Sequence, residues 1–441
     1  MKPLKKGIRL PDFKYRSLSS TQIHLLRPAR FLIFLLNQQA GTPAKPCVQE
    51  GDPVWVGTQI AEAADPNSVP IHSSVSGRVS KIMEDRILIE SDEADKLEPS
   101  IQVRTEIPSD PEQLSAMIRE SGIVDFGGKG TPTHLRLAEA RTNKVETLIL
   151  DGCESEPFLT ADHMLMLGHP VEILKGAELL RIASGAQRAI IAIEQDKLEA
   201  LEVLNSKNYN LKLEQIKTVA LPVRYPQGSE RALAETILGK RLKRGETALQ
   251  AGALVENVAT AFAVYEAVYL NKPFYERVIT ISGSCVFEPK NIWARIGTQT
   301  ADLLRACKGF MREPKRVIFG GPMTGEAISH LDEPTTKKVR GILAFSSELE
   351  TFGQEEPCIR CGFCVEICPE LLVPETLVRA VQHENLNLAR EYDINSCTEC
   401  GLCTYICPSK IPMVAVIRKG KSVLTQADPQ QEPAYAFSSR G

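Results

Sequence analysis

Two runs of cysteine near the C-terminal end constrain this chain more than any other feature. They have the same spacing, C-x2-C-x2-C-x3-C-P, and consist of Cys358, Cys361, Cys364 and Cys368, then Cys397, Cys400, Cys403 and Cys407. Three thiolates at such short intervals wrap one corner of a cuboidal iron–sulfur cluster, and Gly362 and Gly401 let backbone amides approach its sulfides. The spacing therefore predicts two 4Fe–4S clusters, which makes electron transfer the expected function.

The proline that follows each run suggests how the eight ligands are shared. In two-cluster ferredoxins with this spacing, the fourth cysteine of each run binds the other cluster. We therefore assign Cys358, Cys361, Cys364 and Cys407 to one cluster, and Cys397, Cys400, Cys403 and Cys368 to the other. The alternative is a pair of zinc knuckles, but the usual zinc spacing lacks the third close cysteine and the trailing Cys-Pro. Between the runs, 374–392 is rich in helix formers and predicts a helical module.

Composition excludes several classes of function. The 52 basic and 55 acidic side chains give a net charge of −3, so no basic surface points to nucleic acid. The longest early apolar run, 31–36, is far shorter than the roughly 20 residues that span a bilayer. The basic N-terminus leads into polar residues and predicts no secretory signal. We expect a cytoplasmic protein, soluble or peripheral to a membrane.

The rest of the chain alternates between β-rich and mixed segments. The first hundred residues have short apolar runs separated by turn signals, which predicts a small β domain. From about 111 to 267, β-rich runs at 145–150 and 189–193 alternate with helical spacing such as 197–204, which predicts an α/β layer. A second β-rich stretch lies between 277 and 321.

Two short motifs in the α/β stretch have the composition of a ligand site. Gly127, Gly128 and Gly130 precede an expected helix from His134, and such a loop can present amides to phosphate. The strand at 145–150 runs into Glu154-Ser155-Glu156-Pro157, which puts carboxylates at the edge of the sheet where α/β ligand crevices lie. Each motif alone is also compatible with an ordinary turn, tight in the first case and acidic in the second.

The order of the motifs carries a resemblance to known families. The glycine loop, the Glu-Ser-Glu-Pro turn, Tyr225 to Glu230 and Glu256-Asn257-Val258-Ala259-Thr260 resemble the flavin subunit of respiratory complex I. Together with the cysteine runs and the motifs at 41–46, 72–77 and 320–323, the chain resembles the RnfC/RsxC family of the Rnf electron-transport complex nearly end to end.

This resemblance implies a multidomain α/β plus β fold. It implies a barrel-sandwich hybrid at 1–105, a flavin- and nucleotide-binding α/β domain like that of the complex I protein at 106–267, and a β-grasp (SLBB-like) domain at 268–335. A helical two-cluster ferredoxin-like domain would follow at 345–418, and the polar segment 419–441 is expected to be a disordered tail.

The resemblance also implies site residues and cofactors. FMN would lie against Gly127, Gly128, Gly130, Asn257 and Thr260, and the pyridine-nucleotide side would be lined by Glu154, Glu156, Tyr225 and Glu230. The chain departs from the family at two positions: Lys129 replaces an alanine, and Thr131 replaces a phenylalanine expected to stack near the nicotinamide. Lys129 would favour an anionic flavin or phosphate, or point to solvent. No catalytic acid, base or nucleophile is expected.

The implied function is that of a peripheral, cytoplasmic-face subunit of an Rnf-type ion-translocating complex. It would pass electrons between NADH, or another donor, and ferredoxin or membrane-embedded iron–sulfur partners through FMN and two 4Fe–4S clusters. Two alternatives share the same domains: a corrin (cobalamin) reductase, and a non-enzymatic two-cluster adaptor whose nucleotide pocket has degenerated, as Lys129 and Thr131 would suggest.

Overall fold

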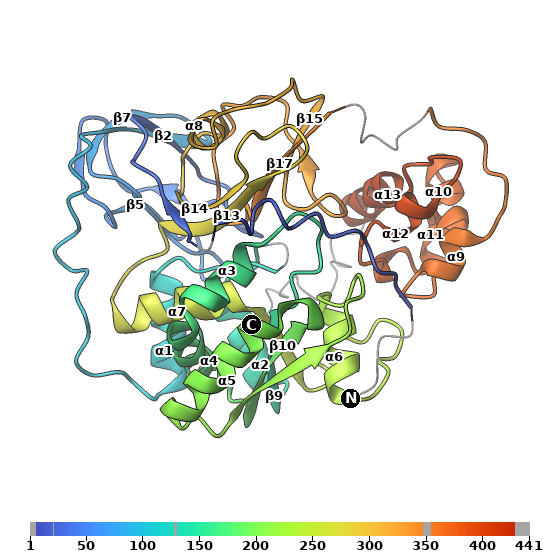
Figure 1. The fold of residues 1–441 in the computed structure, drawn as a ribbon, viewed down its shortest axis with the longest axis horizontal. Helices are drawn as coiled ribbons and strands as arrows, with labels where there is room; N and C mark the ends of the chain where they lie inside the picture. The colour runs from blue at the N-terminus through green and yellow to red at the C-terminus, as the bar shows by residue number, and fades with distance from the viewer. Residues whose placement is uncertain (1–5, 21, 128–129, 347–353, 428–441) are drawn as a thin grey trace.

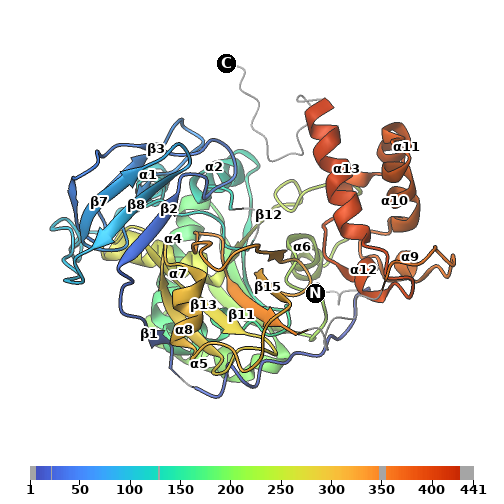
Figure 2. The same cartoon turned by 90° about the horizontal axis from the view of Figure 1, so that it is seen from above.

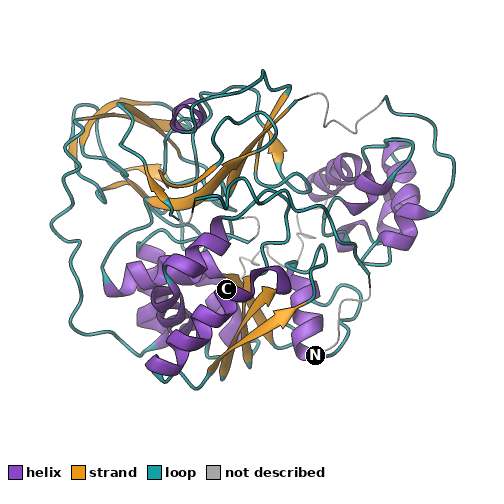
Figure 3. Ribbon diagram, viewed as in Figure 1, coloured by secondary structure: helices purple, strands orange, loops and turns teal. Residues whose placement is uncertain are grey.

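The computed structural model describes residues 6–20, 22–127, 130–346 and 354–427. Two β-rich parts lie side by side, a layered α/β part packs beneath them, and a compact group of helices sits at one end of the molecule (Figures 1 and 3). The cysteine-rich helical module thus forms one end of the molecule, with α6 (Glu230–Leu238) of the α/β part as a neighbour in both Figure 1 and Figure 2.

The N-terminal part is built from short antiparallel strands, as the turn-rich sequence predicts. One sheet has the order β2-β8-β7-β4 and the other β3-β5-β6. Alternating burial along β2 places Leu32 and Phe34 in the core, opposite Ile87 and Ile89 of β8. The strands are β2 (Phe31–Leu35), β3 (Lys45–Pro46), β4 (Pro53–Val54), β5 (Gln59–Glu62), β6 (Ile71–His72), β7 (Gly77–Ile82) and β8 (Arg86–Ser91).

The α/β part has a parallel sheet of order β11-β10-β9-β12 with helices around it. Its strands are β9 (Thr147–Gly152), β10 (Arg188–Glu194), β11 (Ile216–Leu221) and β12 (Ala253–Asn257). Its helices are α1 (Pro111–Glu120), α2 (Thr133–Thr142), α3 (Ala161–Gly168), α4 (Pro170–Ser184), α5 (Leu198–Leu211), α6 (Glu230–Leu238) and α7 (Val258–Tyr269). All of β9 is buried, which explains its continuous apolar run.

The third part is a six-stranded mixed sheet of order β1-β14-β13-β17-β15-β16 with one helix. Its elements are β1 (His24–Leu25), β13 (Glu276–Ser282), β14 (Lys290–Arg295), α8 (Thr300–Ala306), β15 (Arg316–Phe319), β16 (Glu326–Ala327) and β17 (Gly341–Phe345).

Two expected domain limits need correction here. Strand β1 lies within the expected 1–105 domain but pairs with β14 of this sheet, and β17 lies beyond the expected limit at 335 although it pairs with both β13 and β15. The physical reason is that β17 fills the gap between two strands that would otherwise be unpaired edges.

The cysteine module contains α9 (Phe363–Ile367), α10 (Pro374–Gln382), α11 (Leu386–Glu391), α12 (Leu402–Ile406) and α13 (Met413–Ala427). The stretch 374–392 is helical as expected, in two helices. The expectation of a disordered tail from 419 is wrong as far as Ala427, because α13 continues to that residue and packs Leu424 into the module's core. Residues 428–441 lie outside the described part. None of the helices in the described ranges is long and apolar enough to cross a membrane.

Candidate functional site

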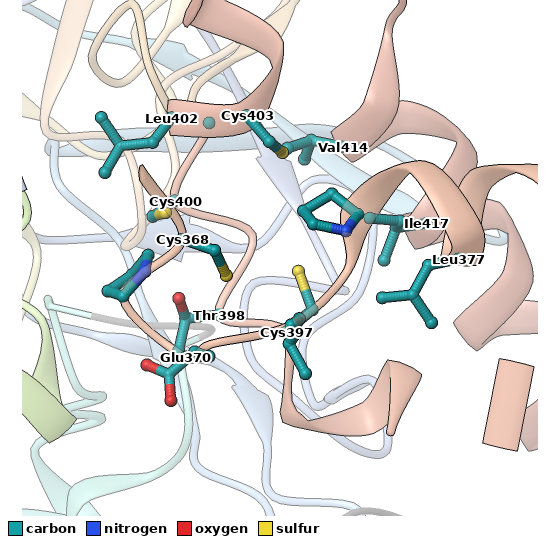
Figure 4. A pocket seen from close by; sticks show the side chains of 14 residues that line it. Cys368, Glu370, Leu377, Cys397, Thr398, Cys400, Leu402, Cys403, Val414 and Ile417 are labelled. Carbon is teal, nitrogen blue, oxygen red and sulfur yellow. The ribbon is translucent and has the colours of Figure 1, made fainter. Parts of the chain in front are cut away.

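Four cysteines from both runs surround one hollow at the inner side of the helical module. Cys368 reaches it from the end of α9, whereas the other three come from the loop before α12 and from α12 itself: Cys397, Cys400 and Cys403. Figure 4 shows these side chains around a common space, closed by Leu377, Leu402, Val414 and Ile417. We call this hollow the inner cavity.

The remaining four cysteines line a second hollow, the outer cavity. Its lining includes Cys358, Cys361, Cys364 and Cys407, together with Ile359 and Phe363. Cys358 and Cys361 are exposed, so this cavity opens at the surface, whereas the inner cavity is buried among aliphatic side chains. The structure thus groups the cysteines into the same two sets as the crossover assignment; that these thiols are the cluster ligands stays a prediction.

The loops that carry the cysteines have the backbone that a cluster requires. Gly362 and Gly401 adopt φ values of 79° and 84°, and each directly precedes a short helix. The amide of Glu399 donates to Cys397 Sγ at 3.4 Å, as amides around cluster ligands do. Within the described ranges no three cysteine, histidine or acidic side chains converge closely enough to hold a single metal ion.

The glycine loop leads into α2 as predicted, and its surroundings suit an anion. Helix α2 begins without a side-chain cap, and the buried Thr133 hydroxyl in its first turn lacks a hydrogen-bond partner within the described residues. The buried guanidinium of Arg277 lies 4.5 Å from the ring of Phe126, directly before Gly127. A helix N-terminus without a side-chain cap and a buried cation are groups that could hold the phosphate of FMN.

Individual loop positions support the same interpretation. Among the described residues, a Cβ added at Gly127 would meet only Asp125 Oδ1, at 3.5 Å, and Asn257 Cβ, at 3.8 Å, so these atoms leave room beside it. Gly130 has φ +78° and packs against the side chain of Lys338. Gly128 and Lys129 lie outside the described residues.

Asn257 and Thr260 lie at the start of α7, and Thr260 is bonded to the glycine loop. Asn257 caps α7: its Oδ1 accepts from the amide of Ala259 at 2.7 Å, and its Nδ2 donates to Asp162 Oδ2 at 2.8 Å. Thr260 Oγ1 accepts from the amide of Phe126 at 3.4 Å. The two predicted flavin contacts are therefore buried at the base of the glycine loop.

The predicted nucleotide-side residues make contacts within the protein. The Glu154 carboxylate accepts from the amides of Asp162 and His163 at 2.8 and 3.1 Å, at the N-terminus of α3. Burial, with the nearby Asp162 charge, raises the pKa of Glu154 to about 7. Glu156 accepts from the amides of Met323 and Thr324 at 3.0 and 3.1 Å, so it bonds to the third part of the fold.

Tyr225 and Glu230 also make contacts within the protein. The Tyr225 hydroxyl donates to the carbonyl oxygen of Cys400 at 2.7 Å, which joins the α/β part to the inner cavity. Glu230 begins α6 and lies 3.8 Å from Arg136, whose Nε donates to the buried Glu256 at 2.7 Å. Each of the four residues expected on the nucleotide side therefore contacts a different partner within the protein.

Sequence reasoning missed three charged residues of this region. Arg277, Asp162 and Lys14 are buried within it, and the ammonium group of Lys14 donates to the carbonyl oxygen of Glu154. Burial lowers the pKa of Arg277 to about 9. Arginine and lysine are seldom buried, but nothing in their local sequence distinguishes them from surface residues.

Comparison with family models supports this division of the chain. An RnfC barrel sandwich hybrid domain matches residues 2–103, a Nuo51 FMN-binding domain matches 118–266, and a 4Fe-4S dicluster domain matches 354–411. These matches confirm the barrel-sandwich hybrid, the flavin-binding domain and the two-cluster domain, and they assign FMN and 4Fe–4S clusters as cofactors. The β-grasp domain expected at 268–335 stays a prediction. The fold also resembles a chain in the crystal structure of an NAD+-reducing NiFe-hydrogenase in its H2-reduced state, with a TM-score of 0.52 and 18% identity over 75% of this chain and 70% of that one.

Relatives with similar sequences cover nearly the whole chain. The C subunit of the proton-translocating ferredoxin:NAD(+) oxidoreductase complex of Clostridium ljungdahlii is 35% identical, over 89% of this chain and 87% of its own. Its Na(+)-translocating counterpart in Acetobacterium woodii is 34% identical over 84% and 85%, and the counterpart in the ion-translocating oxidoreductase complex of Rhodobacter capsulatus is 34% identical over 96% and 83%. The chain therefore belongs to the RnfC family of Rnf-complex proteins and is a subunit of an oxidoreductase.

Proposed function

We propose that this chain is the peripheral electron-input subunit of an Rnf-type ion-translocating complex. It would pass electrons between NADH, or another donor, and ferredoxin or membrane-embedded redox subunits, through FMN in the α/β part and clusters in the inner and outer cavities. The names of the relatives support ion translocation and the ferredoxin:NAD couple, and they favour this assignment over a corrin reductase.

The observation that carries the proposal is the contact between Tyr225 and Cys400. It places the inner cavity directly against the α/β part, whereas the outer cavity opens at the surface beside Cys358 and Cys361. The geometry supports the order flavin, inner cluster, outer cluster, partner protein. Glu370, which also lines the inner cavity, pairs with Arg231 of α6 at 3.0 Å and adds a second connection on that side.

The protein's own residues would mainly bind and orient the cofactors. FMN, when bound, exchanges electrons in pairs with a hydride carrier and singly with clusters. The amides of α2 and the guanidinium of Arg277 would hold its phosphate, Thr260 would keep the loop in place, and Asn257 would cap the adjacent α7. The aliphatic wall of the inner cavity would exclude water from its cluster.

A two-cluster adaptor without nucleotide binding is a second candidate. Three residues expected on the nucleotide side, Glu154, Glu156 and Tyr225, are engaged in bonds within the protein. Such residues would have to give up these bonds to contact NADH. An adaptor would receive electrons from another redox protein instead.

An anaerobic titration of the purified protein separates the candidates. We expect bound FMN and about eight irons per chain, and NADH should bleach both the flavin and the cluster absorbance. Flavin that is present but not bleached by NADH, with clusters still reducible by dithionite, would favour the adaptor. Co-purification with integral membrane subunits, rather than with a cobalamin-dependent partner, tests the assembly and the membrane-peripheral location.

A further inference from the structure

Hydrogen bonds hold both the backbone and the side chain of Tyr225 in position. Its backbone forms a bridge with Ile8, in which the amide of Tyr225 donates to the Ile8 carbonyl at 2.8 Å and the reverse bond is 3.1 Å long. Its side chain is only 5% exposed, and its hydroxyl donates a hydrogen bond to the carbonyl oxygen of Cys400. A buried donor with a fixed backbone can hold the Cys400 loop in one position.

The loop that contains Cys400 also packs closely against the third, six-stranded part of the fold. A Cβ added at Gly401 would lie 2.5 Å from the carbonyl oxygen of Met323, and the Gly401 φ of +84° also disfavours a side chain. The amide of Met323 is in turn bonded to Glu156. The Cys400–Gly401 peptide is therefore clamped between two parts of the protein that lie outside the cysteine module.

The bond from Tyr225 also has an electrostatic consequence. A hydroxyl that donates to a peptide carbonyl polarises the peptide, and in a buried site such polarisation strengthens the neighbouring amide donors. The amide of the same peptide is that of Gly401, which lines the inner cavity together with Cys400. Positive polarisation near a cluster favours its reduced form, which carries one more negative charge.

We infer that Tyr225 is a positioning residue for the inner cluster, which it holds against the α/β part and whose reduction potential it raises. This inference rests on the proposed function only for the direction of electron flow, because the potential of the cluster can be measured without the donor or acceptor of the complex. A higher potential at the inner cluster would favour electron transfer out of the flavin domain.

The test is a mediated redox titration of the full-length, cluster-loaded protein, followed by electron paramagnetic resonance. Tyr225→Phe should shift the midpoint potential of one cluster downward and leave the other unchanged. The shifted signal should be the one altered in a Cys400→Ser variant. Tyr392→Phe is the matched control, because this exposed tyrosine belongs to the same module and lines neither cavity.

A second variant distinguishes a direct effect on the cluster's midpoint potential from an effect of lost structure. Placing 4-aminophenylalanine at position 225 keeps a donor at the end of the ring and should move the potential back toward the wild-type value. Equal shifts of both clusters, no shift of either, or failure of this variant to restore the potential would overturn the inference. Chemical mediators replace NADH and flavin in this titration, so its outcome is independent of whether NADH is the donor.

Discussion

The carboxylate of Glu156 holds Thr324 by two hydrogen bonds, one from its amide at 3.1 Å and one from its hydroxyl. The two residues come from different parts of the fold, since Glu156 follows β9 and Thr324 lies between β15 and β16. Gly321, in the same loop, has no room for a side chain, because a Cβ there would overlap the carboxylate of Glu156. The Glu-Ser-Glu-Pro motif therefore joins domains in this chain, in addition to any contact with a ligand.

Replacing Glu156 by Gln should loosen that junction. An amide group offers one acceptor oxygen where the carboxylate offers two, so at least one of the bonds to Met323 or Thr324 is lost. We expect hydrogen exchange at these amides to become roughly tenfold faster, the equivalent of about 1.4 kcal/mol. Glu199→Gln, at an exposed position on α5, serves as the control. Unchanged exchange combined with weakened NADH binding would instead make Glu156 a ligand contact.

The sequence predicted those features that depend on local spacing. The cysteine runs, the glycine loop before α2, and the strands near 145–150 and 189–193 all appear where the pattern indicated, because turns and strand periodicity are local properties. The grouping of Cys368 with the second run was predictable only because two-cluster ferredoxins supply the rule.

Contacts between distant segments were not predictable from one sequence. Arg136 and Glu256 are 120 residues apart and both buried, yet neither position differs in local pattern from a surface charge. Strand β1 has two residues and pairs with β14 across more than 260 positions, so no period marks it. The interdomain contacts of Glu156 and Tyr225 were not predictable for the same reason, since each is made with a loop from another part of the fold.

Gly127→Ala should lower flavin content without unfolding the protein. Within the described ranges the nearest atom to an added Cβ is Asp125 Oδ1 at 3.5 Å, an ordinary contact, so we attribute any loss to a ligand that needs close approach to the backbone. We expect less FMN per chain after gel filtration and an unchanged circular dichroism spectrum. Gly168→Ala, at the end of α3 with open space around it, should retain its flavin. Equal flavin content in both variants would place FMN elsewhere.

Cys368→Ser should affect the cluster bound by the other run. Cys368 shares the inner cavity with Cys397, Cys400 and Cys403, while the other three cysteines of its own run line the outer cavity. The electron paramagnetic resonance signal lost or altered should match that of Cys400→Ser and differ from that of Cys361→Ser. Cys47→Ser, at an exposed cysteine far from the module in sequence, should change neither signal. A match with Cys361→Ser would contradict the crossover.

Lys337 should make stability depend on pH above neutrality. Its side-chain nitrogen is fully buried, donates to the carbonyls of Pro70 and Gly122 at 2.7 Å each, and burial lowers its pKa to about 7 from the usual 10.5. Between these two values the unfolded chain binds the proton and the folded chain does not, so stability rises with pH across this window. A neutral amine also has two hydrogens, which match the two carbonyls.

The measurement for Lys337 is the thermal midpoint at pH 7 and pH 9. From pH 7 to pH 9, the thermal midpoint of the wild type should rise relative to that of Lys337→Met. At pH 9 the variant should be the less stable of the two, because it leaves both carbonyls without a donor. Lys338→Met, at the exposed neighbouring position, should follow the wild type. Parallel pH dependence of all three proteins would show that Lys337 keeps an ordinary pKa when folded.

Thr131→Phe should strengthen NADH binding if nicotinamide stacks beside the glycine loop. The backbone of Thr131 is already fixed, since its carbonyl accepts from the amide of Asp125 at 2.7 Å, so a new side chain leaves that bond intact. An aromatic face contributes on the order of 1 kcal/mol beyond burial, which corresponds to a roughly five- to tenfold lower Kd. Flavin bleaching titrated with NADH gives the comparison, with flavin content unchanged and exposed Thr142→Phe as control. If NADH reduces neither the wild type nor Thr131→Phe, the absence of an aromatic ring at position 131 is not what prevents NADH binding. The electron donor is then another redox protein.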